Sequence, residues 1–215
     1  MENCVDLKFP EIPVVREEEI PDWVYSARRE MQEIVPGLFL GPYAAATKSQ
    51  LQVLLDHGIT HIVCIRQDIE AQFIKPNFPK HFEYLVLNVA DSANENIISH
   101  FPKVKEFIDK SNLFGGKTLV HGNAGMSRSA ALVIAYVMET FGLSFKDAVR
   151  YVQQRRFCIS PNEGFMRQLE EYEPIFTARL QILSQRERPL TSGLKRSHED
   201  VDYETAEDSL SHVVA

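Results

Sequence analysis

The stretch that decides the fold reads Lys117-Thr-Leu-Val-His-Gly-Asn-Ala-Gly-Met-Ser-Arg-Ser129, and it continues as Ala130-Ala-Leu-Val-Ile-Ala-Tyr-Val-Met138. Residues 117–120 are a short apolar run after a Gly-Gly turn, which predicts a buried strand. The run after Ser129 is apolar on all sides and too long for a core strand, so it predicts a buried helix that ends at Gly142. Residues 121–129 therefore lie between a strand and the N-terminus of a helix.

This junction has the composition of an anion-binding loop. Backbone amides in such a loop and at a helix N-terminus point toward one spot. Gly125 lets the backbone bend without a Cβ clash, and Arg128 can hold two phosphate oxygens. The alternative is a tight turn with a structural arginine. The predicted phosphate-binding residues are Gly122, Asn123, Ala124, Gly125, Met126, Ser127 and Arg128.

Length and composition favour one domain with an ordinary core. The chain has 215 residues, of which 44% are hydrophobic. Cys4, Cys64 and Cys158 have no zinc or disulfide spacing, which favours a reducing compartment. The longest apolar run is too short to cross a bilayer, and the N-terminus lacks the apolar segment of a signal peptide. We therefore expect no membrane association.

Charge is unevenly distributed along the chain. Residues 1–22 contain seven acidic and two basic residues, and residues 189–215 contain six acidic and two basic residues. Since the total is −7, residues 23–188 carry a balance of +2. A mildly basic centre favours an acidic ligand, although acidic ends also serve solubility alone.

Apolar runs predict four strands, at residues 35–40, 61–66, 82–89 and 117–120. Pro36 cannot donate a ladder hydrogen bond, so the first strand is expected at an edge of the sheet. Residues 67–80 form a polar connector.

Helical spacing of apolar residues predicts helices at 44–57, 94–112, 129–142, from 145 onward and after residue 160. Pro102 lies inside the second helix and is expected to bend it. Ser160 and Glu163 fit a capping box that opens the last helix, with Pro161 at the first helical position.

Strands that alternate with helices predict an α/β fold with a central, mostly parallel mixed sheet and helices on both faces. The loop then lies at the carboxyl end of a strand, where such folds bind ligands. Three parts are predicted: an acidic, extended arm at residues 1–27, held to the core by Trp23 and Tyr25; a domain at 28–180; and an acidic, disordered tail at 185–215.

The chain resembles the dual-specificity phosphatases, which are cysteine phosphatases. Residues 121–129 match the signature His-Cys-x-x-Gly-x-x-Arg-Ser/Thr at every defined position but one. The resemblance covers about residues 30–178 and implies a single cysteine-phosphatase-like domain. Its other motifs are Pro36-Gly-Leu-Phe-Leu-Gly41, Gly58-Ile-Thr-His-Ile62, Tyr84-Leu85 and Pro161-Asn-Glu-Gly-Phe-Met-Arg-Gln-Leu169.

Gly122 stands where that family carries its reactive cysteine. The family's thiolate attacks phosphorus, so the resemblance implies a catalytically inactive pseudophosphatase without cofactor or metal. Asp91 matches the family's general-acid position, with helix capping as the alternative role. His121 and Ser129 are implied to support the loop, and the hydroxyls of Ser127 and Ser129 are expected to bond to the loop backbone.

Two other groups have simpler interpretations. Cys64 reads as a small buried hydrophobe, and nothing places Cys158 at the loop, so neither is expected to replace the missing nucleophile. Arg155 and Arg156 read as a solvated helix end or a second contact for acidic partners.

The retained loop and Arg128 favour a module that binds proteins phosphorylated on Ser, Thr or Tyr, and the resemblance implies MAP kinases as one class of partner. Two alternatives stay open: a scaffold that uses surfaces outside the pocket, and a weak phosphatase. We expect a monomer without nucleic-acid partners, in the cytoplasm, the nucleus or both, because Lys195-Arg196 is too short to define a nuclear signal.

Overall fold

The computed structural model describes residues 9–14 and 24–186. Its centre is a five-stranded sheet in the order β1-β2-β5-β3-β4. β1 and β2 pair antiparallel, and all other neighbours are parallel, which confirms the predicted α/β fold with a mixed, mostly parallel sheet. The strands are β1 (Gln32–Val35), β2 (Leu38–Pro42), β3 (Ile59–Arg66), β4 (Glu83–Asn88) and β5 (Lys117–Gly122).

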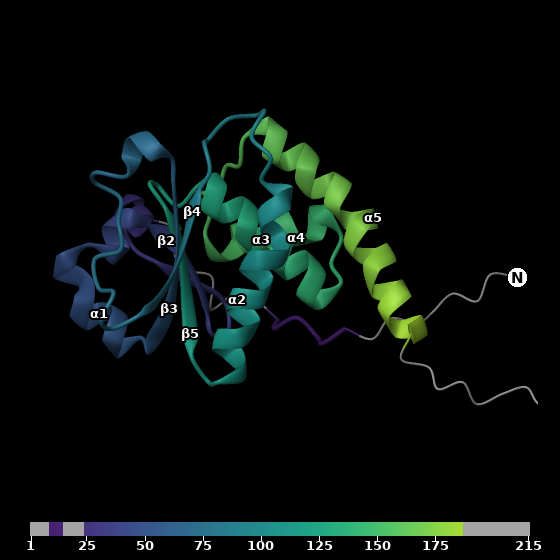
Figure 1. The fold of residues 1–215 in the computed structure, drawn as a ribbon, viewed down its shortest axis with the longest axis horizontal. Coiled ribbons are helices and arrows are strands. Elements are labelled where there is room, and N and C mark those ends of the chain that lie inside the picture. The colour runs from purple at the N-terminus through teal and green to yellow at the C-terminus, as the bar shows by residue number, and fades with distance from the viewer. Residues whose placement is uncertain (1–8, 15–23, 187–215) are drawn as a thin grey trace, which may run out of the picture.

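Helices cover both faces of the sheet (Figure 1). The short α1 (Leu51–Asp56) lies on one face, and the four longer helices lie on the other. Every residue from Arg128 to Glu139 is buried, which confirms the central apolar helix predicted from the sequence. The four longer helices are α2 (Phe101–Leu113), α3 (Arg128–Phe141), α4 (Phe145–Arg155) and α5 (Glu163–Arg186).

The central strand β5 places the loop. β5 lies between β2 and β3, with Gly122 opposite Pro42 and His121 opposite Cys64. The chain leaves the sheet at Gly122 and enters α3 at Arg128, so residues 123–127 cross the carboxyl end of the sheet at its middle. This is the position that the sequence predicts for the loop.

The predicted edge strand at residues 35–40 is wrong. The structure has a hairpin instead, with Pro36 and Gly37 in its turn and Gly37 at φ +83°. β2 is buried throughout and pairs with β5, so β1 is the edge strand. Pro36 therefore marks a turn, in which its missing N–H is no disadvantage.

Three predicted helix starts also differ from the structure. The helix predicted at 94–112 begins at Phe101, and Pro102 lies in its first turn, where proline is tolerated, rather than bending it. The helix predicted at 44–57 divides into two 3₁₀ turns and α1. The N-cap of α5 is Asn162, whose Oδ1 accepts the amide of Phe165 at 3.0 Å, so the capping box at Ser160 is wrong.

The chain ends are described only in part. Residues 9–14 run along the helical face, where Ile12 packs on the core and the hydroxyl of Tyr151 donates to the carbonyl of Pro13 at 3.0 Å. The Tyr25 side chain is 77% exposed, so it does not hold the arm to the core. Trp23 and the predicted tail from residue 187 lie outside the described residues, while α5 continues to Arg186.

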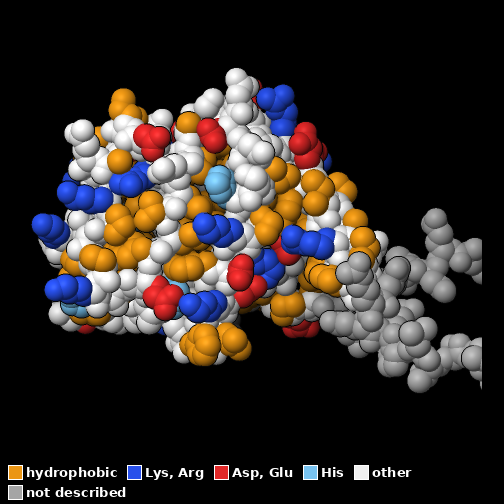
Figure 2. Space-filling view, in the orientation of Figure 1, with side chains coloured by type: hydrophobic (Ala, Val, Ile, Leu, Met, Phe, Trp, Pro, Cys, Tyr) orange, Lys and Arg blue, Asp and Glu red, His pale blue; other side chains and the backbone are white. Residues whose placement is uncertain are grey.

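The surface in view is mixed in character. Figure 2 shows charged side chains of both signs lying singly among hydrophobic ones, without a broad patch of one sign on this face. Within residues 9–14 and 24–186, no single helix has the length and apolar composition to cross a bilayer, although α3 and α4 pass that test as a pair joined at a bend of 120°.

Gly164, in the first turn of α5, allows this helix to touch the loop that carries Asp91, because a Cβ at Gly164 would overlap the backbone of Ala93. We expect Gly164→Ala to lower the free energy of unfolding by about 3 kcal/mol, measured by urea denaturation. Gly115→Ala is the matched control, since Gly115 has φ +70° but no atom within 4 Å, and should cost only about 1 kcal/mol. Equal losses of unfolding free energy in the two variants would show that the loop around Ala93 can move to accommodate the added methyl group.

Candidate functional site

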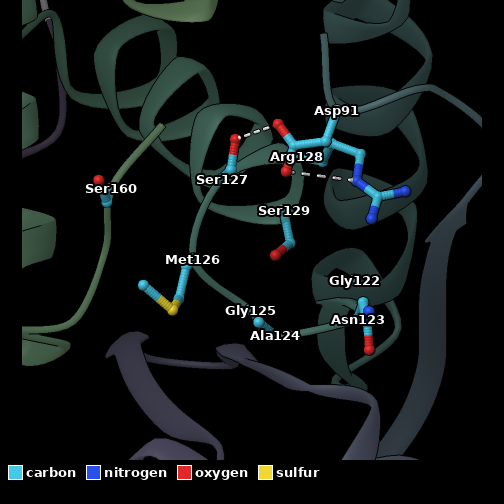
Figure 3. A pocket seen from close by; sticks show the side chains of 10 residues that line it. All are labelled: Asp91, Gly122, Asn123, Ala124, Gly125, Met126, Ser127, Arg128, Ser129 and Ser160. Carbon is cyan, nitrogen blue, oxygen red and sulfur yellow. Dashed lines mark hydrogen bonds and ion pairs between the residues drawn. The ribbon is translucent and has the colours of Figure 1, made fainter. Parts of the chain in front are cut away.

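A cavity of about 300 Å³ opens at the carboxyl end of β5 (Figure 3). It gathers every residue predicted to bind phosphate, together with Ser129 and Asp91. His121 lies behind it in β5. Ser160, which the sequence assigned to a helix cap, lines the cavity as well.

The loop turns its carbonyl groups outward. The amides of Tyr43 and Ser160 donate to the first and last carbonyls of residues 123–126, at 3.0 and 2.8 Å. Arg156 donates to the middle two, at 3.2 and 2.9 Å. The amides of residues 124–127, by contrast, have no acceptor within the described part of the chain. A loop with its carbonyls bound from outside and its amides unpaired is suited to hold an anion.

Gly125 is required by this geometry. Its φ is +68°, and a Cβ would lie 2.5 Å from the carbonyl group of Gly41 in β2. Any side chain at this position would push the loop away from the sheet.

Arg128 is buried and paired with a carboxylate. Its Nη1 and Nη2 donate to the two carboxylate oxygens of Glu70 at 2.6 and 3.0 Å, and Nη1 also donates to the carbonyl of Val89 at 3.1 Å. A guanidinium has five N–H groups, so Nε–H and the second N–H of Nη2 remain. This Nε–Nη2 edge can still bind two phosphate oxygens.

Glu70 is a site residue that the sequence pattern does not reveal. Its position three residues after Gln67 indicates a helix cap, and its Oε2 does accept the amide of Gln67 at 2.8 Å. Hydrogen bonding from Arg128 is the main cause of its lowered pKa. Because Glu70 stays ionised, it offsets the charge of Arg128 and fixes the plane of the guanidinium.

Asp91 lies at the rim, held by two side chains. Its Oδ1 accepts from the hydroxyl of Ser127 at 2.7 Å and from the amide group of Asn162 at 2.9 Å, and its Oδ2 lies 3.9 Å from Nε of Arg128 (Figure 3). Ser127 therefore bonds to Asp91 rather than to the loop backbone. Asp91 does not cap α2, whose N-cap is His100. A carboxyl in this place can face the leaving oxygen of a bound phosphate ester.

Residue 122 has room for a side chain. A Cβ there would lie 3.5 Å from the hydroxyl oxygen of Ser129 and 3.8 Å from the carbonyl oxygen of Ile65, which are ordinary contacts. The buried hydroxyl of Ser129 has no partner among the residues of known placement, so its expected bond to the loop backbone is wrong. This hydroxyl therefore faces a position at which no side chain is present.

The prediction that Arg156 belongs to a solvated helix end is wrong. Its side chain is fully buried, and Nε, Nη1 and Nη2 together donate to four backbone carbonyls and one side-chain amide. No carboxylate of the described residues pairs with it. The acceptors are the carbonyls of Ala124, Gly125, Arg28 and Glu30 and the side chain of Gln32.

The remaining ionisable groups do not extend the site. Within the described part of the chain, no three His, Cys, Asp or Glu side chains are placed to hold a metal ion. Neither Cys64 nor Cys158 lines the cavity, and burial raises the pKa of Cys64 to about 11.

His121 gives the site a pH dependence. Burial lowers its pKa from 6.5 to about 4, so the folded protein takes up this proton less readily than the unfolded chain. Its contribution to stability is present above pH 6.5 and is lost as the pH falls toward 4. Between these values, we expect the free energy of unfolding to fall by about 3 kcal/mol more in the wild type than in His121→Gln, measured by urea denaturation. An equal fall in the free energy of unfolding of the wild type and of His121→Gln over this pH range would contradict the expectation.

Comparison with known proteins agrees with this geometry. The chain is 61% identical to the human serine/threonine/tyrosine-interacting protein over 208 residues, which cover 92% of this chain and 93% of the relative. It is 38% identical to dual specificity protein phosphatase 1 of Arabidopsis thaliana over 140 residues, 65% of this chain and 67% of the relative.

Solved structures and a family model point the same way. The crystal structure of the human tyrosine phosphatase-like serine/threonine/tyrosine-interacting protein superposes with a TM-score of 0.69 and 68% identity, over 69% of this chain and 99% of that one. Residues 38–175 match the model of the dual specificity phosphatase catalytic domain, which spans β2 to α5 and includes the whole cavity loop. The chain therefore belongs to the dual-specificity phosphatase family.

Proposed function

We propose that this protein is a catalytically inactive pseudophosphatase that binds phosphorylated proteins in the cavity formed by residues 122–129. The observation that carries the proposal is the combination of two features around a position that bears no side chain: loop amides without an acceptor among the described residues, and an Nε–Nη2 edge on Arg128 that makes no hydrogen bond to them. These two features bind an anion, and the absence of a side chain removes the group that would attack it.

The lack of a nucleophile follows from the residues at the site. Gly122 has no atom that can attack phosphorus, and neither Cys64 nor Cys158 lines the cavity. Loss of a covalent nucleophile costs a factor on the order of 10⁴ or more in rate. Binding is favoured by the same change, because a thiolate would place a negative charge against the phosphate.

The proposed partners are proteins phosphorylated on Ser, Thr or Tyr. The name of the human relative, serine/threonine/tyrosine-interacting protein, supports this class, and family membership supports phosphorylated MAP kinases within it. A binding module of this kind would shield a phosphorylated residue from active phosphatases or anchor the phosphoprotein. The proposed location, cytoplasm or nucleus, follows from such partners.

Arg128 should contribute most of the side-chain affinity for phosphate. Replacing it alone would leave Glu70 buried and unpaired, so the comparison is made between Glu70→Gln and Glu70→Gln/Arg128→Met. We expect the double variant to bind a phosphopeptide about 10- to 100-fold more weakly, since charge-assisted bidentate hydrogen bonds are lost. Fluorescence anisotropy gives the two Kd values, and thermal denaturation verifies that both variants are folded.

Equal affinity in those two variants would favour the alternative, a scaffold that binds through surfaces outside the cavity. One observation supports that alternative: Ile69 and Phe73 on the connector beside Glu70 are 78% and 55% exposed. Capture of a partner that persists in Glu70→Gln/Arg128→Met and is lost on Ile69→Ser/Phe73→Ser would select it.

The geometry left at residue 122 allows a direct test of inactivity. Gly122→Cys should produce measurable phosphatase activity on a phosphotyrosine ester, because the new side chain fits beside Ser129 and Asp91 faces the cavity. Gly122→Ala, which adds the Cβ without the thiol, is the matched control and should stay inactive.

A folded Gly122→Cys protein without activity would show that the site has changed at more than the nucleophile. Phosphate release by the wild type above the level of Gly122→Ala/Arg128→Met would instead support a weak phosphatase and contradict the proposal.

A further inference from the structure

The segment before β1 is fastened to the phosphate loop by Arg156. This one guanidinium donates to the carbonyls of Ala124 and Gly125 in the loop and to those of Arg28 and Glu30 in the segment. Because Arg156 is fully buried, the segment and the loop are held at a fixed distance from each other. The 3₁₀ helix Tyr25–Arg29 is thereby placed at the rim of the cavity.

A second, smaller cavity of about 210 Å³ lies between this segment and the loop. Ala124 lines both this rim cavity and the phosphate cavity, so the two are neighbours. The rim cavity is lined by Tyr25, Arg28, Arg29, Pro42, Ala44 and Ala124, a set without an acidic side chain.

Within residues 9–14 and 24–186, the two arginines of the rim cavity form no ion pair. No carboxylate of the described residues lies within ion-pair distance of either one. Arg28 is oriented by neutral groups: its guanidinium lies 5.4 Å from the ring centre of Tyr25, and Nη2 lies 3.1 Å from the sulfur of Met126 in the loop. Arg29 is exposed.

Arg128 differs from them in this respect. Its charge is offset by Glu70, whereas no carboxylate on the described part of the chain pairs with Arg28 or Arg29. The unbalanced positive charge next to the phosphate cavity therefore comes from the segment before β1. Such charge selects an anionic group on whatever ligand occupies the cavity.

We propose that Arg28 and Arg29 form a second anion subsite, which binds an acidic side chain that flanks the phosphorylated residue of the partner. This inference rests on the proposed function, since the phosphate anchors the peptide beside the rim. The two guanidinium groups then pair with Asp or Glu of the peptide, with Tyr25 packing against its backbone. The protein thus prefers phosphosites in acidic sequence.

The test uses two phosphotyrosine peptides that differ only in having Asp or Asn on both sides of the phosphorylated residue. We expect the wild type to bind the Asp peptide about fivefold more tightly than the Asn peptide, which corresponds to two partly exposed ion pairs. This ratio of the two Kd values should shrink at high salt. In Arg28→Ser/Arg29→Ser the ratio should fall to about one, while the Kd for the Asn peptide stays within twofold. Arg29→Ser alone, which breaks no hydrogen bond among the described residues, should give an intermediate ratio.

The matched control is Lys146→Ser/Arg150→Ser, which removes the same charge from an exposed part of α4 outside both cavities. It should keep the wild-type ratio. A ratio of one in the wild type, or an unchanged ratio in Arg28→Ser/Arg29→Ser, would overturn the subsite while leaving the proposed function intact. Failure of the wild type to bind even the Asn peptide would overturn the proposed function and the subsite with it.

Discussion

The outward direction of the loop carbonyls is the constraint on which the site depends. Four consecutive carbonyl groups are bound from outside the loop, two of them by the buried guanidinium of Arg156. A peptide unit that turns its C=O outward turns the N–H of the next residue inward, so these bonds collect the amides of residues 124–127 around one cavity. Arg156 also brings a buried positive charge beneath the loop, and no carboxylate of residues 9–14 or 24–186 pairs with it, so its charge favours an anion nearby.

The charges around the cavity divide into a balanced and an unbalanced set. Arg128 is held by Glu70 in a bidentate ion pair, which orients the guanidinium but leaves little net charge. Asp91 adds a negative charge at the rim and is fixed by neutral donors from Ser127 and Asn162. Arg128 therefore acts through directed N–H groups, together with the loop amides, while Arg28, Arg29 and Arg156, which lack acidic partners among the residues described, add net positive charge around the cavity. A site with two carboxylates can therefore still be suited to an anion.

Sequence reasoning works where the signal is local. The continuous apolar runs on both sides of residues 121–129 define β5 and α3 without help from the rest of the chain, and the loop residues follow. Prediction from sequence fails where the role of a residue depends on partners that are distant along the chain. Arg156 looks solvated because it ends a helix, yet its acceptors come from residues 28–32 and 124–125. Glu70 reaches Arg128 across 58 positions of sequence, and no local pattern encodes that contact.

The glycine at position 122 has no structural cause in the backbone. The glycines with positive φ include Gly125 but not Gly122, and a Cβ at 122 meets only ordinary contacts. Glycine is therefore not needed for folding there, in contrast to Gly125 and Gly164, where a Cβ would collide with backbone. The glycine also gives no hydrogen-bond partner to the buried hydroxyl of Ser129, which faces position 122 and has no partner among the described residues. A loop that keeps its amides, its arginine and its hydroxyl around a position without a side chain keeps the features suited to hold an anion and lacks the atom at which a cysteine nucleophile would sit.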